Sequence, residues 1–300
     1  MVKNSKNNTF KIIDNLNIFL GQKLFSNLNV FTYNLFNYFY KLIIVKKKPD
    51  YIKNYIENGH QKFPSVPEKY IDNLIENLNK QREIISNNSD NIKEKGHHTF
   101  ELTDEIKDKI LKIINNPLSP LIENLKTYFN SEIILSNSRI SRNYKINSQE
   151  EKYSNFFHND NYVCTLIKVF INLQDVTIKH GPLRFIKKKD SKKVLKKNFI
   201  NINRIPNVKQ PDLINYNEGK KGEIFICDTT KIIHSAGIPE NSNYRDMLFL
   251  EFCACPNKKN IKMIDKKDND EITFPKEYLS KIISKPAGLK NLIKCFFSYI

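Results

Sequence analysis

The sequence predicts an α+β protein with a mainly β core, a sandwich or barrel with helices packed outside it. Three observations support this class. Apolar residues in the first half recur at helical spacing. From Glu132 onward the chain changes to short runs rich in Val, Ile, Phe and Cys, and Gly or Pro turn signals separate those runs. Short strands that follow a helical first half are typical of this architecture.

The helices are predicted before Glu132. Over residues 50–85 the apolar positions fall at three- and four-residue spacing, at Ile71, Leu74, Ile75 and Leu78. Residues 86–96 are polar and predict an exposed loop. Another helix is expected after Thr103, because a threonine side chain can cap the first turn and two acidic residues follow it. A further helical stretch is expected to run through Phe129.

The strands are predicted after Glu132. They fall on residues 133–135, 163–173, 183–186, 223–227 and 247–255, with turn signals at Gly181-Pro182, Gly222, Gly237 and Pro239. The chain is therefore divided into a helical N-terminal extension over residues 1–95, a central domain over residues 96–256 and a helical C-terminal tail over residues 257–300.

Residues 10–48 are rich in aromatic and apolar side chains and end in a lysine cluster. The favoured interpretation is one or two helices packed on the core. The alternative is a peripheral contact with an anionic membrane through an interfacial helix. Nowhere does the chain reach the ~18–20 consecutive apolar residues that a membrane-spanning helix needs, and its first residues do not resemble a secretory signal.

The net charge of +17 permits an anionic partner. A solvated, lysine-rich surface is the favoured interpretation, because the lysines are spread along the whole chain. Arginine is rare and no nucleic-acid motif occurs, so no specific nucleic-acid partner is expected. The five cysteines lack disulfide-framework spacing, and several lie in strand-like runs, which predicts a reducing, cytoplasmic location. Nothing in the sequence indicates an oligomeric state.

Three residues of metal-binding type occur in a characteristic order. His158 and Asp160 are one residue apart, so on a strand both side chains project to the same face. His234 follows the later strand at 223–227. Two imidazoles and one carboxylate can hold Fe(II) and leave the opposite face open, as in non-haem iron oxygenases. Zinc accepts similar ligands, so the residue types alone leave zinc open. Arg245, further along, can hold the far carboxylate of 2-oxoglutarate.

The sequence around these residues resembles the phytanoyl-CoA dioxygenase-like branch of the Fe(II)/2-oxoglutarate oxygenases. The likeness covers roughly residues 130–256. It begins at Phe157-His158-Asn159-Asp160, continues through residues 168–176 and Gly181-Pro182-Leu183, and closes with Gly222-Glu223, Asp228, His234, Gly237 and Arg245.

The resemblance implies that the central domain is a double-stranded β-helix, a cupin-like jelly roll. It makes His158, Asp160 and His234 the metal ligands and catalytic centre, and it pairs Arg245 with the C5 carboxylate of 2-oxoglutarate. The implied cofactors are Fe(II) and 2-oxoglutarate, with O₂ as co-reactant and ascorbate as a candidate reductant.

The implied reaction hydroxylates a small or medium organic substrate, such as a lipid, a sugar-containing compound or a secondary metabolite. 2-Oxoglutarate is decarboxylated to succinate and CO₂. Because halogenating relatives replace the metal-binding carboxylate with a small residue, Asp160 favours hydroxylation.

Several positions leave alternatives open. The basic stretch at 187–193 differs from the usual family sequence, and it is either a contact for an anionic substrate or a solvated loop. Ala236 replaces a frequent hydroxyl residue, which leaves Ser235 as the candidate cosubstrate contact. Lys168, inside an apolar strand, either helps to bind a carboxylate in the pocket or reaches solvent. Arg139 and Arg142, on a neighbouring strand, either face the pocket or have a structural role. His97 and His98 are expected in an exposed loop, and His180 in a turn.

Two other functional classes compete with the oxygenase. One is a non-catalytic jelly roll that acts as a binding or scaffold protein and retains the metal-binding motif. The other is a basic protein that associates with a membrane surface or with nucleic acid and in which the three residues are incidental. The first predicts no consumption of 2-oxoglutarate, and the second predicts strongly salt-dependent binding to anionic surfaces.

Overall fold

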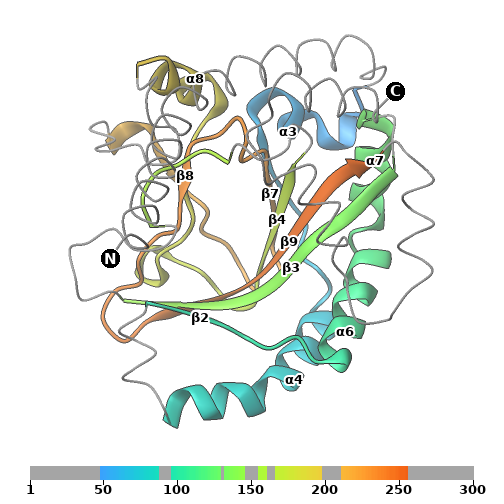
Figure 1. Ribbon diagram of the computed structural model, residues 1–300, viewed down its shortest axis with the longest axis vertical. Helices are drawn as coiled ribbons and strands as arrows, with labels where there is room; N and C mark the ends of the chain where they lie inside the picture. The colour runs from blue at the N-terminus through green and yellow to red at the C-terminus, as the bar shows by residue number, and fades with distance from the viewer. Residues whose placement is uncertain are drawn as a thin grey trace, which may run out of the picture.

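The computed structural model of the chain describes residues 48–87, 96–129, 132–145, 155–160, 166–197 and 211–255. Two antiparallel sheets form its core (Figure 1). The larger has six strands in the order β1-β7-β4-β9-β3-β2, and the smaller has three in the order β6-β5-β8. The strands are β1 (His60–Phe63), β2 (His97–Thr99), β3 (Glu132–Tyr144), β4 (Ile167–Asn172), β5 (Arg184–Ile186), β6 (Ile214–Tyr216), β7 (Ile224–Cys227), β8 (His234–Ser235) and β9 (Tyr244–Cys255).

Helices cover one face of the larger sheet. They are α4 (Glu68–Asn87), α6 (Asp104–Asn115) and α7 (Ser119–Phe129), which lie beside β3 and β9 at the right and bottom of Figure 1. Their apolar side chains pack with the sheet residues that point the same way, such as Ile140, Val169 and Leu250. The remaining helical segments are η2 (Asp50–Ile52), α3 (Lys53–Asn58), η3 (Ile178–His180), α8 (Lys188–Lys197) and η4 (Pro211–Leu213).

The other face of the larger sheet looks toward the smaller sheet. A second apolar cluster joins Phe170, Phe225 and Phe249 of the larger sheet to Leu183 and Phe185 at β5. The rings of Phe185 and Phe225 lie 5.2 Å apart between their centroids. Because successive strand residues point to opposite faces, each long strand contributes alternately to the helix-covered core and to the space between the sheets.

The five strand predictions are confirmed, since each falls on part of β3, β4, β5, β7 or β9. The helix predicted after Thr103 is also confirmed: α6 begins at Asp104, and the Thr103 side chain accepts a hydrogen bond from the amide of Ile106. His180 lies at the end of a 3₁₀ turn, as expected. Cys227 is a buried thiol of β7 whose pKa is raised by burial, which fits a core residue.

Three local predictions are wrong. Residues 50–85 are not uniformly helical, because Gly59 ends α3 with a left-handed φ of 79° and β1 then pairs with β7. His97 and His98 do not lie in an exposed loop, since β2 pairs with β3 over His97–Thr99. The basic stretch at 187–193 is not a loop, because α8 begins at Lys188.

The fold class is confirmed at the level of an antiparallel, sheet-rich core with several helices. The finer assignment to a double-stranded β-helix stays a prediction. So does the division at residues 95 and 256, although β1 from the predicted extension pairs with β7 of the central domain. Most of the predicted membrane-contact segment, the C-terminal tail and most of the 86–96 loop lie outside the described residues. Among the residues that are described, no helix is both long and apolar enough to cross a bilayer.

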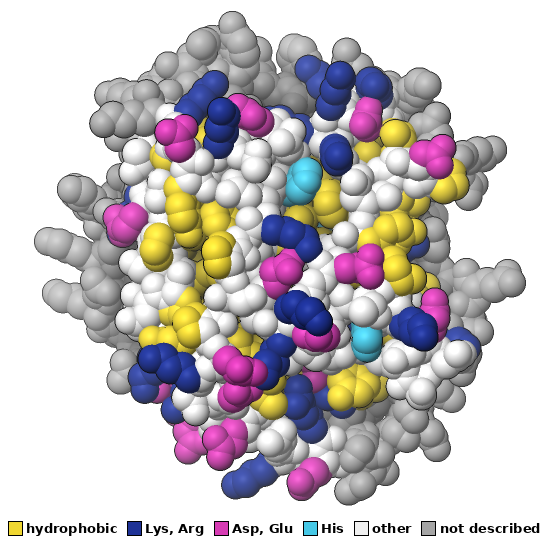
Figure 2. Space-filling model, turned by 180° about the vertical axis from the view of Figure 1, so that it is seen from behind, with side chains coloured by type: hydrophobic (Ala, Val, Ile, Leu, Met, Phe, Trp, Pro, Cys, Tyr) yellow, Lys and Arg dark blue, Asp and Glu magenta, His cyan; other side chains and the backbone are white. Residues whose placement is uncertain are grey.

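The surface charge is distributed rather than gathered. On the face shown in Figure 2, Lys and Arg side chains are interspersed with Asp and Glu side chains. Several lysines on the described surface pair with acidic residues, as Lys220 does with Asp175 and Lys221 with Asp72. On that face, this arrangement fits a solvated basic surface better than a nucleic-acid footprint.

Candidate metal centre and cavity

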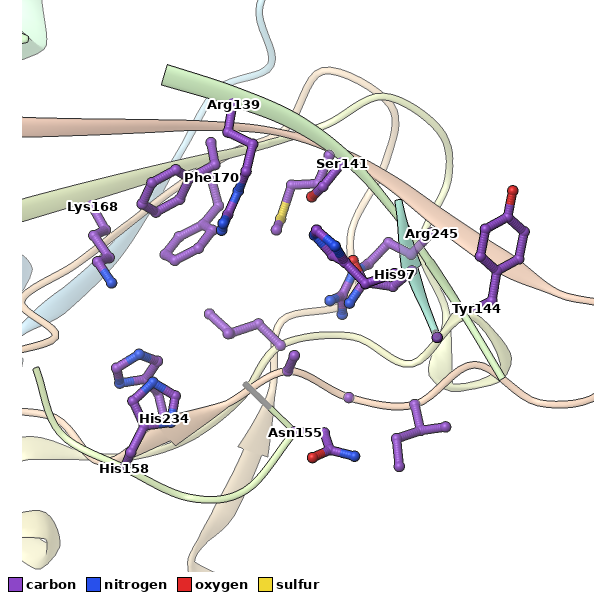
Figure 3. A pocket seen from close by; sticks show the side chains of 18 residues that line it. His97, Arg139, Ser141, Tyr144, Asn155, His158, Lys168, Phe170, His234 and Arg245 are labelled. Atoms are coloured by element: carbon purple, nitrogen blue, oxygen red, sulfur yellow. The ribbon is translucent and has the colours of Figure 1, made fainter. Parts of the chain in front are cut away.

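A cavity of about 220 Å³ lies between the two sheets. This volume is below the ~300–1,000 Å³ of pockets for drug-sized ligands, so the cavity suits small molecules. Figure 3 shows His158 and His234 at one side, Arg245 and His97 at the other, and Lys168, Phe170 and Arg139 along the sheet above them. The walls also include the apolar residues Leu183, Ile238, Met247 and Phe249.

The three predicted metal ligands meet at one side of this cavity. One ligand atom from each of His158, Asp160 and His234 lies within 4.8 Å of the other two. Asp160 Oδ1 is 3.8 Å from His158 Nε2, and Asp160 Oδ2 is 3.5 Å from His234 Nε2. Two atoms at right angles on one ion, each ~2.1 Å from it, lie ~3 Å apart. A small contraction of the group would therefore bring all three onto a single ion.

The backbone holds the two histidines side by side. His158 and His234 form a β-bridge in which each amide donates to the other residue's carbonyl at 2.9 Å. Each ring is also oriented from behind, because Nδ1 of His158 lies 2.9 Å from the carbonyl of Phe156, and Nδ1 of His234 lies 3.3 Å from that of Ile232. A proton on Nδ1 donated to a carbonyl leaves Nε2 as the free lone pair, which is the arrangement that metal-binding histidines use.

The protonation states also suit a divalent cation. Burial lowers the pKa of His234 to about 3, so its imidazole is neutral at neutral pH. Burial opposes ionisation of Asp160, but its electrostatic interactions with His234 and with the Lys168 ammonium group outweigh burial and lower the pKa of Asp160 to about 2. A buried, ionised carboxylate beside a neutral His234 imidazole is a state in which such groups bind metal.

Lys168 lies on β4 and points into the cavity. Its ammonium group contacts Asp160 Oδ2 and also lies 5.4 Å from the centre of the Phe249 ring. It therefore supplies the positive charge next to the carboxylate. The side chain lines the pocket rather than reaching solvent, and its predicted contact with a cosubstrate carboxylate stays a prediction.

Arg245 is the most unusual cation of the cavity. It lines the wall from β9 and is only 2% exposed. Nη1 donates to the carbonyl of Gly181, whereas Nε has no hydrogen-bond partner. Among the described residues no carboxylate forms an ion pair with it, and burial together with Arg184 lowers its pKa to about 10. A buried cation without a counter-charge is costly, so the cavity favours an anion beside Arg245.

Two glycines allow the loop that holds Arg245. Gly181 has a φ of +61°, and a Cβ there would lie 2.4 Å from the carbonyl carbon of Ile238. A Cβ on Gly237 would lie 2.2 Å from the carbonyl oxygen of Pro182. The segments around Gly181 and Gly237 therefore cross with no room for side chains, and this crossing places the Gly181 carbonyl against Arg245.

Ser235 and Arg142 do not reach the cavity. Ser235 is fully buried on β8 and is absent from the cavity wall, whereas its neighbours His234 and Ala236 line it. This position does not support the predicted cosubstrate contact of Ser235. Arg142 pairs with Asp246 on the helix-covered face of the larger sheet. The basic residues at 187–193 are also absent from the wall.

His97 and Arg139 also line the wall; the sequence leaves Arg139 open between a pocket and a structural role, and it gives His97 no site role. Arg139 lies on β3 and His97 on β2, and both line the cavity. The alternation along β3 was the available signal for Arg139, because Arg139, Ser141 and Asn143 share one strand face. His97 carried no local signal, since its position depends on the pairing of β2 with β3.

No family model matches the chain, and no curated protein matches it. Its fold is similar to those of several solved structures. One is SnoN, described as a non-heme alpha-ketoglutarate-dependent epimerase from nogalamycin biosynthesis, with a TM-score of 0.47, 12% identity and coverage of 73% of this chain and 88% of SnoN. Another is HygX from Streptomyces hygroscopicus with nickel and 2-oxoglutarate bound, with a TM-score of 0.47, 9% identity and coverage of 69% and 87%.

A third is ThoJ, described as a non-heme monooxygenase, with a TM-score of 0.44, 10% identity and coverage of 68% of this chain and 77% of ThoJ. These likenesses are too distant to assign an activity to the chain. The function is therefore inferred from the residues of the cavity itself.

Proposed function

We propose that the protein is a non-haem Fe(II)- and 2-oxoglutarate-dependent dioxygenase of the phytanoyl-CoA dioxygenase-like kind, with a double-stranded β-helix core. It would hydroxylate a small organic substrate in the cytoplasm and convert 2-oxoglutarate to succinate and CO₂. The observation that carries the proposal is the position of Arg245 in the cavity beside the group His158, Asp160 and His234. Arg245 is a buried cation that pairs with no carboxylate of the described residues.

The donor set fits the metal. Two imidazole nitrogens and one carboxylate suit Fe(II) and leave its other positions to small molecules. When bound, the iron would supply the activation of O₂. His158, Asp160 and His234 would hold the ion, and the backbone bridge and ring contacts of the two histidines fix the directions of their imidazoles.

The rest of the wall fits a dicarboxylate cosubstrate. Arg245 would bind the carboxylate of 2-oxoglutarate that is remote from the metal, because its guanidinium offers forked donors and lacks an internal counter-charge. The carbonyl of Gly181 orients that guanidinium. Phe170, Met247 and Phe249 cover the sheet side of the cavity and would exclude water from the reacting groups.

Succinate formation from 2-oxoglutarate, Fe(II), ascorbate and O₂ tests this proposal, because such turnover proceeds slowly without the organic substrate. Asp160→Ala removes the anionic ligand, so we expect succinate formation to fall to background and Fe(II) affinity to fall at least ~100-fold. Asp175→Ala is the matched control, because Asp175 is an exposed carboxylate paired with Lys220 on the surface.

The two readouts separate the outcomes. Equal succinate formation by wild type and Asp160→Ala would contradict the assignment of the metal centre. Tight Fe(II) binding by the wild type without any consumption of 2-oxoglutarate would instead favour the non-catalytic binding protein.

A further inference from the structure

The wall of the cavity carries a second arginine that the 2-oxoglutarate site does not use. Arg139 projects from β3 into the cavity, and Figure 3 shows its side chain pointing from the larger sheet toward the space beside Phe170. Its guanidinium carbon lies 5.0 Å from the centre of the Phe249 ring. One face of the guanidinium is therefore covered by an aromatic side chain, which holds it without neutralising its charge.

The surroundings of Arg139 are short of negative charge. Its Nε is buried and has no hydrogen-bond partner. Burial lowers the pKa of Arg139, and the charge of Glu251 only partly offsets this effect. The described residues that line the cavity include Arg139, Lys168 and Arg245, and none of them is acidic. Asp160, which is not one of these lining residues, already contacts Lys168. A second anion would balance the remaining cation.

Arg139 and Arg245 form two separate positions rather than one clamp. In the register of β3 and β9, Arg139 stands opposite Phe249, whereas Arg245 stands opposite Asn143. Four residues of strand separate the two positions, which corresponds to ~14 Å along the sheet. Consistent with this separation, burial and the charge of Arg184 shift the pKa of Arg245, whereas burial and the charge of Glu251 shift the pKa of Arg139. One small carboxylate is therefore not expected to engage both.

Polar groups lie around Arg139 on the same side of the cavity. Ser141 and Asn143 share its face of β3, and His97 stands opposite Asn143 on β2. Burial, reinforced by the charge of Arg139, lowers the pKa of His97 to about 4, so this imidazole is neutral at neutral pH. The group offers one fixed positive charge together with neutral hydrogen-bonding side chains, next to the apolar surface of Phe170 and Phe249.

We propose that Arg139 is the anchor for an anionic group of the organic substrate, a carboxylate or a phosphate or sulfate ester, at a subsite distinct from that of 2-oxoglutarate. The apolar part of the same substrate would lie against Phe170 and Phe249. The inference rests on the proposed function in one respect, namely that 2-oxoglutarate occupies Arg245.

Calorimetry on the full chain tests the subsite with phenyl phosphate, benzoate and the uncharged benzyl alcohol as probes, under anaerobic conditions with Fe(II) and saturating 2-oxoglutarate. We expect at least one anionic probe to bind tenfold or more tightly than benzyl alcohol, and the comparison of the two anions shows which group is preferred. Arg139→Gln should weaken that anion at least tenfold and weaken 2-oxoglutarate much less. Arg139→Lys should restore part of the affinity.

Arg245→Gln should weaken the binding of 2-oxoglutarate strongly and that of the anionic probe much less. Lys80→Gln, at an exposed residue of α4, controls for the loss of one positive charge. Thermal unfolding of each variant checks that it is folded. Equal binding of charged and uncharged probes by the wild type, or an Arg139→Gln effect larger on 2-oxoglutarate than on the anion, would overturn the inference. Loss of 2-oxoglutarate binding in the wild type, with anion binding through Arg139 intact, would overturn the proposed function instead.

Discussion

Arginines on the two faces of the larger sheet differ in whether they pair with a carboxylate. On the helix-covered face, Arg142 donates to both carboxylate oxygens of Asp246 at 2.6 and 2.7 Å, and Arg82 of α4 reaches the same carboxylate at 2.7 Å. On the cavity face, neither Arg245 nor Arg139 forms an ion pair with a carboxylate in the described part of the chain. The sequence neighbours Arg245 and Asp246 point to opposite faces and do not pair with one another.

The difference separates stability from function. A buried carboxylate that joins β3, β9 and α4 serves the folded state, because removing one member of such a group leaves an uncompensated charge. A buried cation whose partner is missing weakens the folded state and gains its partner when an anionic ligand binds. Along β3 and β9, the alternation of side chains between the two faces therefore decides whether a charged residue serves stability or ligand binding.

The largest effect is expected from Asp246→Ala. Asp246 is 0% exposed and is shared by two arginines. Its removal should lower the free energy of unfolding by about 3–5 kcal/mol, measured by urea denaturation. Asp175→Ala, which breaks an exposed pair with Lys220, should cost at most ~1 kcal/mol. Similar losses in both variants would remove the distinction between the two faces.

Arg245→Met should produce the opposite result. We expect the KM for 2-oxoglutarate to rise roughly 30- to 150-fold, which corresponds to the ~2–3 kcal/mol of a charge-assisted contact. The free energy of unfolding without ligand should not fall, because the substitution removes a buried charge with no counter-charge. Succinate assays and urea denaturation measure the two quantities. A marked loss of stability with an unchanged KM would mean that Arg245 is structural.

Gly181→Ala tests how strongly the crossing loops fix Arg245. The positive φ and the close approach to Ile238 should cost about 1–3 kcal/mol of stability, and the displaced carbonyl should also raise the KM for 2-oxoglutarate. Gly219→Ala is the control, because its added Cβ would meet only the movable carboxylate of Glu223. Equal KM values in the two variants would show that the Gly181 carbonyl does not orient Arg245.

The smallest effect belongs to the helix-covered face. Thr103→Ala removes the cap of α6 and should cost about 1 kcal/mol, with no change in the KM for 2-oxoglutarate. Thr127→Ala, at an exposed position inside α7, should change stability by less than ~0.5 kcal/mol. A change in KM caused by Thr103→Ala would show that the two faces are coupled.

The sequence was sufficient where residue type and local spacing carry the information. The cap at Thr103 and the strand runs after Glu132 are local, and each matches the structure. His158 and Asp160 also lie close together as expected, but His158 forms an isolated bridge instead of the expected strand. The short strands β1 and β2 could not be predicted in this way, because four and three residues form strands only by pairing with β7 and β3. The same long-range pairing brings His97 to the cavity.

The register between β3 and β9 decides that Arg139 faces the cavity and that Arg142 pairs with Asp246 on the opposite face. Either arginine was a candidate for the pocket until the pairing of β3 with β9 placed Arg142 opposite Asp246 and Arg139 opposite Phe249. The sequence analysis does not predict the helix at 188–197, because it leaves the basic residues open between a substrate contact and a solvated loop. Asp190 and Lys193 nevertheless pair one turn apart within this helix.

The hydrogen-bonded bridge between His158 and His234 has a consequence for metal exchange. Because main-chain hydrogen bonds pair the two residues, His158 and His234 stay side by side whether or not an ion lies between their rings. Replacing one divalent ion by another is therefore expected to change the chemistry at the centre while the polypeptide around it keeps its shape.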